Sequence, residues 1–171
     1  MGGHTLEPEF AHLLWHDNPV YGLRLEIGDP DAGDWRSDLV LDLDHIVAWS
    51  CGGGGALFQV APATLTFHHA GDLRLAVDCG NTGGQVALHE LSIDRVMCEP
   101  VQDQKVCLDR PYYRWTIELN WPKGGRIAFA ASGFTLALRA ETVPSATPRL
   151  PAADRRRRWG DRHVPKHQDP V

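Results

Sequence analysis

The chain has 171 residues, 43% of them hydrophobic, and a net charge of −5, which suits one folded domain with a tail. Residues 1–142 hold 10 Lys and Arg against 19 Asp and Glu, whereas residues 143–171 hold 7 against 3. The acidic part argues against nucleic acid as the main partner, because phosphates would be repelled. No apolar run is long enough to cross a membrane and no signal peptide is evident, so we expect a cytoplasmic protein without membrane contact.

The first expected element is a short helix over residues 10–15, in which Phe10, Leu13 and Leu14 share one face. Strands follow it, because apolar and polar residues alternate with the period of two that only an extended chain gives. They are predicted at residues 20–27, 38–49, 57–60, 64–69, 72–78, 86–97, 113–121, 127–129 and 134–138.

The second of these strands shows the pattern most clearly. Leu39, Leu41 and Leu43 fall in one phase, and Asp38, Asp42 and Asp44 fall in the other. Alternation of this kind predicts one face on a core and one face in water. The predicted core residues, each in the apolar phase of its segment, are Leu41, Leu43, Leu75, Trp115, Ile117 and Phe129.

The alternation stops at Thr142, and a basic stretch rich in Pro and Arg follows. Its composition predicts disorder, since it offers little apolar surface to bury. We therefore expect an antiparallel β domain over residues 1–142 and a disordered tail over residues 143–171. The predicted fold is mainly β, as a β-sandwich, a curved sheet or an open barrel, with one short N-terminal helix.

Two groups of residues are candidates for function. The first is the acidic outer face of Asp38, Asp42 and Asp44, which would bind a basic protein partner through electrostatic steering. The second is a metal site of a hydrolase or small-ligand-binding protein, in which two strands bring carboxylates and imidazoles together. Its members would be His16, Asp17, Asp42, Asp44 and His45.

Other patterns are weaker. The four cysteines are too far apart for a CxxC zinc or redox site, and no nucleotide-binding glycine loop, GxSxG or HExxH motif occurs. We therefore expect no cofactor. Nucleic acid would be contacted only weakly, through the basic run Arg155 to Arg158. A solvated strand face explains the acidic residues without any metal, so the non-enzymatic interpretation is preferred.

The layout resembles small bacterial proteins that include immunity-protein-like families of polymorphic toxin systems. The segments that carry the resemblance are His16-Asp17, residues 39–44, and residues 62–67 ahead of Asp72-Leu73. The resemblance implies a cytoplasmic, non-enzymatic protein whose acidic surface binds and inhibits another protein.

Overall fold

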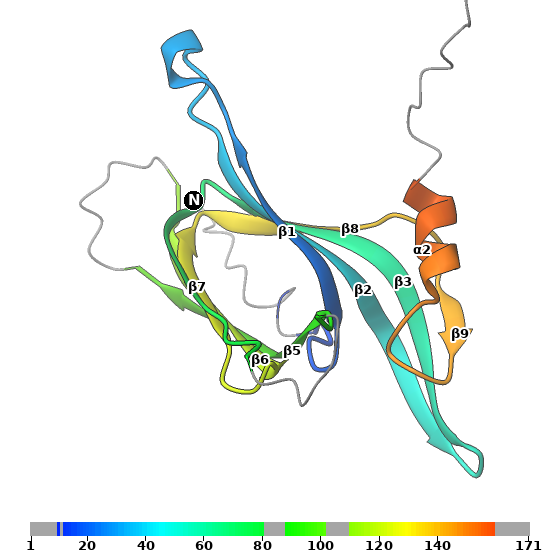
Figure 1. Cartoon of the computed structure of the whole chain (residues 1–171). Coiled ribbons are helices and arrows are strands. Elements are labelled where there is room, and N and C mark those ends of the chain that lie inside the picture. The colour runs from blue at the N-terminus through cyan, green and yellow to red at the C-terminus, as the bar shows by residue number, and fades with distance from the viewer. Residues whose placement is uncertain (1–9, 11, 81–87, 102–109, 160–171) are drawn as a thin grey trace, which may run out of the picture.

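Antiparallel strands make up most of the structure, a computed structural model that describes residues 10, 12–80, 88–101 and 110–159 (Figure 1). The strands in this part of the chain are β1 (Pro19–Ile27), β2 (Ser37–Gly52), β3 (Gly55–His68), β4 (Gly71–Ala76), β5 (Leu91–Pro100), β6 (Tyr113–Trp121), β7 (Arg126–Ala131), β8 (Gly133–Leu138) and β9 (Val143–Ser145). They form one curved sheet in the order β4-β7-β6-β5-β1-β2-β3-β8, with β9 paired to β3. This order does not close on itself. The prediction of a mainly β, antiparallel fold is confirmed.

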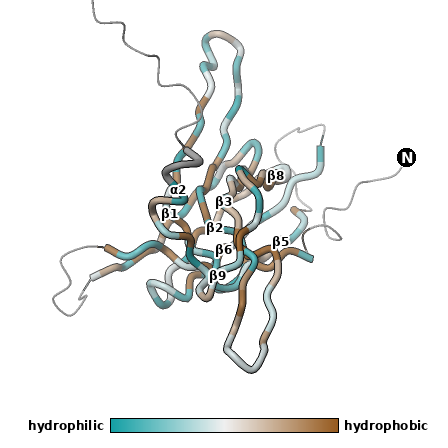
Figure 2. Tube along the Cα trace, turned by 90° about the vertical axis from the view of Figure 1, so that its right-hand side faces the viewer, coloured by the Kyte–Doolittle hydropathy of each residue, from teal (hydrophilic) through white to brown (hydrophobic). Residues whose placement is uncertain are grey.

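The concave side of the sheet holds the hydrophobic core. Hydrophobic and hydrophilic residues follow one another along the strands in Figure 2. In β6, for example, Trp115, Ile117 and Leu119 lie at every second position and are buried. Five of the six predicted core residues are at most 2% exposed, namely Leu41, Leu43, Trp115, Ile117 and Phe129. Alternation alone was enough to find them, because each lies in a strand with a neighbour on both sides.

The prediction that Leu75 is the sixth core residue is wrong, because its side chain is 53% exposed. Leu75 lies in β4, opposite Ile127 of β7. Because β4 is the last strand of the sheet and pairs only with β7, no further strand of the described residues lies beside this side chain on the far side. The position of Leu75 in the apolar half of the alternating pattern therefore did not predict its burial.

The strand pairs at the two ends of the sheet, β3 with β8 and β4 with β7, are connected through a sharp bend, which we call the corner. β3 runs on into β4, and β7 runs on into β8, while β3 pairs with β8 and β4 pairs with β7. The two bent strands therefore lie side by side through the bend, where the Ser132 N–H donates to the His68 carbonyl at 2.9 Å. His69 adopts a left-handed conformation with φ of 54° to make the turn.

The expected N-terminal helix is not borne out by the described residues, 10 and 12–15. They form a turn in which the Leu13 N–H donates to the Phe10 carbonyl. A helix cannot continue through this segment, because Asp17 has a left-handed backbone with φ of 64° and Pro19, which lacks a backbone N–H, follows. The turn instead packs Phe10 and Trp15 against the core, next to Trp115.

The predicted disorder after residue 142 is wrong for its described part, residues 143–159. This segment begins with β9 and ends with α2 (Ala152–Trp159), the only α-helix among the described elements, and lies against the outer side of β2 and β3 (Figure 1). Leu150 is only 2% exposed. The physical reason is a set of contacts to Asp44, described below. Residues 160–171 of the predicted tail lie outside the described residues.

No helix in the part of the chain that the structure describes is long and apolar enough to span a membrane.

Candidate functional site

The predicted acidic outer face is not a solvent-exposed face. Asp42 points outward from β2, but its side chain is 7% exposed because arginines cover it: Arg24 Nη1 lies 2.6 Å from Oδ2, and Arg139 Nη1 lies 3.3 Å from Oδ1. The Asp38 side chain is 13% exposed and accepts the His69 backbone N–H at 3.2 Å. These contacts contradict the expectation that the three aspartates present their charges to a partner.

Asp44 is fully buried, and the C-terminal segment covers it. The Leu150 N–H donates to Asp44 Oδ2 at 2.8 Å, and Arg155 Nε lies 3.4 Å from the same oxygen. The Arg155 guanidinium also lies 3.5 Å from the centre of the Tyr21 ring. Burial is the main cause that raises the pKa of the Asp44 carboxyl, and it also raises the pKa of the nearby Tyr21 hydroxyl.

The five residues of the predicted metal site do not come together. His16 is exposed and lies 3.0 Å from Asp17 and 3.4 Å from Asp94. His45 points to the opposite side of β2 from Asp42 and Asp44, and its Nδ1 lies 3.2 Å from Asn18 Nδ2. Among the described residues, no group of three or more His, Cys, Asp or Glu could hold a metal ion. The geometry thus gives no support to the hydrolase interpretation.

His45 itself is buried, as its phase in the strand predicts. Burial lowers the pKa of its imidazole from 6.5 to about 4. The ring is therefore neutral at physiological pH, and its Nδ1 accepts a hydrogen bond from the Asn18 amide. This contact joins β2 to the turn before β1.

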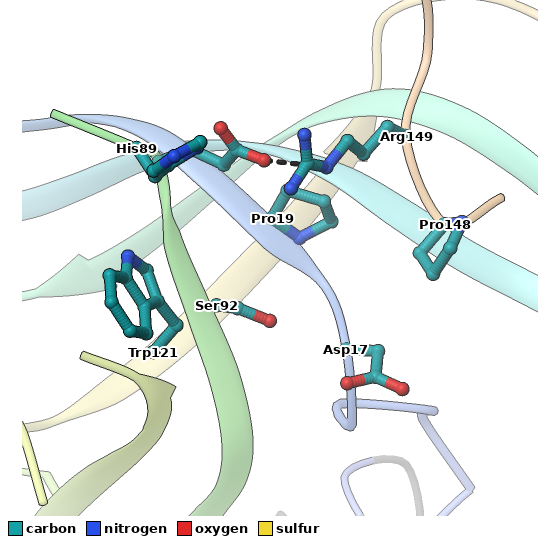
Figure 3. Close-up of a pocket in the computed structure, with 8 residues that line it drawn as sticks. Asp17, Pro19, His89, Ser92, Trp121, Pro148 and Arg149 are labelled. Carbon is teal, nitrogen blue, oxygen red and sulfur yellow. Dashed lines mark ion pairs between the residues drawn. The ribbon is translucent and has the colours of Figure 1, made fainter. Parts of the chain in front are cut away.

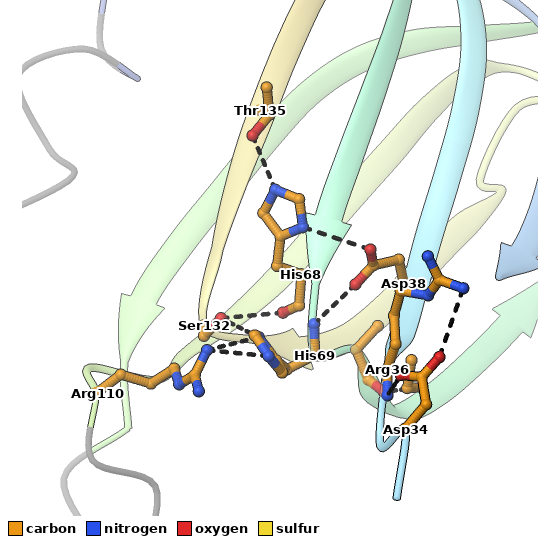
Figure 4. A network of polar contacts seen from close by, with 10 residues as sticks. Asp34, Arg36, Asp38, His68, His69, Arg110, Ser132 and Thr135 are labelled. Atoms are coloured by element: carbon orange, nitrogen blue, oxygen red, sulfur yellow. Dashed lines mark hydrogen bonds and ion pairs between the residues drawn. The ribbon is translucent and has the colours of Figure 1, made fainter. Parts of the chain in front are cut away.

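The corner carries a polar network that contains a serine, two histidines and an aspartate (Figure 4). His69 Nδ1 lies 2.8 Å from Ser132 Oγ, and Arg110 Nη1 lies 2.9 Å from His69 Nε2. A guanidinium can only donate, so the lone pair of the neutral ring faces Arg110, and Nδ1–H donates to Ser132. Burial and Arg110 lower the pKa of His69, which is consistent with a neutral ring.

This arrangement does not make a catalytic triad. The Ser132 hydroxyl accepts from His69 and donates to the His68 carbonyl at 3.2 Å, so the ring is not placed to remove its proton. Asp38 contacts the His69 backbone N–H and not its ring. His68 completes the network with its Nε2 2.8 Å from Thr135 Oγ1. The network holds the bent strands together.

A cleft of about 500 Å³ lies between the start of β1, the ends of β5 and β6, and residues 148–149 (Figure 3). The half-exposed Trp121 ring forms one wall, and Glu90 pairs with Arg149 Nε at 2.6 Å. Asp17 lines it with a left-handed backbone, φ of 64°, and accepts from Asn120 Nδ2 at 2.6 Å. Of the predicted site residues, only Asp17 belongs to this cleft. The sequence did not predict the other residues that line the cleft, because β5 and the C-terminal segment come together only in the folded chain.

Two hairpins extend beyond the barrel-shaped part of the sheet (Figure 1). Both carry exposed large apolar side chains. The β1–β2 arm, residues 22–40, exposes Trp35, and the β2–β3 arm, residues 46–58, exposes Trp49, which is 57% accessible. β1 pairs with β2 only as far as Leu43, so the outer edge of residues 47–52 has no strand partner among the described residues. A signal for this arm is present in the sequence, since no Lys, Arg, Asp or Glu occurs between Asp44 and Asp72.

Neither a family model nor any curated protein or solved structure matches this chain. The resemblance to immunity proteins therefore stays a prediction.

Proposed function

We propose that the chain is a non-enzymatic protein-binding domain and that the β2–β3 arm is its binding surface. One observation carries this proposal: the outer edge of residues 47–52 has no strand neighbour among the described residues, and Trp49 stands exposed beside it. Edge strands are usually shielded by charged side chains, proline or a bulge that turns them away. The arm carries one irregularity, between Ile46 and Ala48, but no charge beyond it.

The partner would add an extended segment to this edge. Such a segment would satisfy the free backbone N–H and C=O groups of β2, and its alternate side chains would pack on Trp49. Trp49 lies directly opposite the half-buried Phe58, so both apolar side chains belong to the same face of the arm. Burying the exposed remainder of Trp49 contributes about 3 kcal/mol, the scale of a binding hot spot.

The negative net charge of the chain favours a basic protein as the partner that binds this edge. The chain carries −5 overall, so two copies repel each other while a basic partner is attracted. Because the arm itself is uncharged, we expect salt to slow association with this partner and to have little effect on dissociation. An immunity-type inhibitor of a basic toxin is the concrete form of this proposal.

The experiment is photo-crosslinking in the native cell, with a crosslinking amino acid in place of Cys51, which is exposed and lies on the same edge and face of β2 as Trp49. The captured protein is identified, purified and titrated against this chain. We expect Trp49→Ala to weaken its binding about thirtyfold, which corresponds to about 2 kcal/mol. Trp35→Ala on the other arm is the matched control, and it should leave the affinity unchanged.

Two results would contradict the proposal. The first is that the crosslinks join only copies of this chain and sedimentation shows a dimer, since the arm would then be a self-association edge. The second is that both tryptophan variants bind the purified partner as tightly as the wild type.

A further inference from the structure

A second surface, separate from the arm, is a cleft of about 430 Å³ on the outer face of β4, β6 and β7. Ile127, Phe129 and Ala131 of β7 pack inward, so the residues between them face out. Its floor consists of small side chains, which are Ala76, Thr116, Ala128 and Ala130. Small residues on three adjacent strands leave a depression where longer side chains would otherwise stand.

Three arginines surround this floor. Arg74 of β4 pairs in register with Ala128, Arg114 of β6 pairs with Ala130, and Arg126 belongs to β7 itself. All three are exposed and line the same cleft, together with one carboxylate, Asp72. The lining therefore carries a local charge of +2 in a chain whose net charge is −5.

These arginines differ from the others whose side chains the structure describes. Six others form ion pairs with carboxylates, and Arg110 contacts His69; the six are Arg24, Arg36, Arg95, Arg139, Arg149 and Arg155. Within the described residues, Arg74, Arg114 and Arg126 form no ion pair with a carboxylate. Glu99 and Glu118 lie in register with Arg114 and Arg126, and Glu118 pairs instead with Arg95 at 2.6 Å. The one polar contact found for the three arginines among these residues is a 3.4 Å bond from Arg126 Nη2 to the Thr116 hydroxyl. Apart from this bond, their donors have no partner within the described part of the chain and could therefore bind an anion.

We propose that this arginine cleft binds the phosphate group of a small phosphorylated organic molecule. Guanidinium groups form paired hydrogen bonds with phosphate oxygens. Three guanidinium groups offer more N–H donors than the two oxygens of a carboxylate can accept, so a phosphate group with three free oxygens fits them better. A phosphate monoester carries about −2 at neutral pH, which balances the local charge. The cleft lies within the size range of small-molecule sites and exceeds what a single anion fills, so the organic part would lie on the alanine floor.

The test is calorimetric titration of the full chain at low salt with inorganic phosphate, ribose 5-phosphate, adenosine monophosphate and adenosine. We expect both phosphate esters to bind saturably, and each to bind more tightly than inorganic phosphate. Adenosine, which lacks the phosphate, should bind at least tenfold more weakly than its monophosphate. Perturbed NMR signals of Ala128 and Ala130 would place the ligand on the floor.

Variants assign the binding to the arginines. Arg74→Gln with Arg126→Gln should weaken ester binding at least tenfold, and the charge-conserving double Lys variant should recover only part of it. Arg36→Gln, an arginine outside the cleft, is the matched control and should bind as the wild type does. The absence of saturable binding up to about 10 mM, or equal binding by the double Gln variant, overturns the site. Equal affinity for inorganic phosphate and the esters overturns the assignment to an ester.

Discussion

Acidification should destabilise this fold through His45, a neutral imidazole held inside the sheet. The side chain is 3% exposed, its ring centre lies 5.9 Å from that of Trp15, and burial lowers its pKa from 6.5 to about 4. Between these two values the unfolded chain binds a proton that the native state excludes. The free energy of unfolding therefore falls as the pH is lowered through this window. Above about pH 6.5 the contribution of the neutral His45 to stability is fully present.

The magnitude follows from the two pKa values. At 1.36 kcal/mol per pKa unit, lowering the pH from about 7.5 to about 4.5 costs about 2.5 kcal/mol through this group alone. Other titrating groups act as well. Asp44, whose pKa is raised, has the opposite sign, because its native state binds the proton more readily than the unfolded chain does. A comparison with a variant that differs only at His45 removes these shared contributions.

The assay is urea unfolding of the wild type and His45→Gln at both pH values. Glutamine keeps an oxygen that accepts from Asn18, but it cannot be protonated in this range. We expect the wild type to lose about 2.5 kcal/mol more than the variant on acidification. If the two lose the same free energy to within about 0.5 kcal/mol, the imidazole is not held neutral by burial and this reasoning is refuted.

Further variants test the packing in the same urea assay. Leu150→Ala should cost about 2–4 kcal/mol because its side chain is buried; a cost below about 1 kcal/mol would mean that the C-terminal segment is not docked. Asp42→Asn should cost about 2–4 kcal/mol, since two arginines lose their carboxylate in a buried site, and an unchanged midpoint would contradict the ion pairs. Leu43→Ala should cost about 2–5 kcal/mol, whereas the exposed Leu75→Ala should cost about 0.5 kcal/mol or less; equal costs would count against the assigned faces.

Alternation in the sequence placed most of the strands and the inward faces of the central ones. It divided β3 wrongly into residues 57–60 and 64–69, because Pro62 was expected to end a strand, and it missed β9. It predicted Leu41 and Leu43 correctly because the side-chain period of a strand is a local property. It could not predict what covers the outer face. Asp42 and Asp44 point outward as expected, yet arginines and backbone from residues 139–155 bury them. Such coverage depends on contacts across about a hundred residues, and no local pattern contains it.

The candidate surfaces were harder to predict for the same reason. The arginine cleft assembles Arg74, Arg114 and Arg126 from three strands whose neighbourhood is fixed only by the order of the sheet. Leu150 is an apolar residue between an arginine and a proline, in a stretch without periodicity. Composition could not reveal that this leucine is buried. The uncharged stretch from residue 45 to 71 was the one local signal of an unusual surface.

The bond from Leu150 to Asp44 also orders the events of folding. It joins residues 106 positions apart, so loop closure delays it until the strands between them are in place. Until then we expect the Asp44 carboxylate to stay hydrated and its burial to come late. In the native protein we expect the same segment to open as a separate unit while the sheet stays intact. Hydrogen exchange at the Leu150 amide would measure that opening directly, apart from global unfolding.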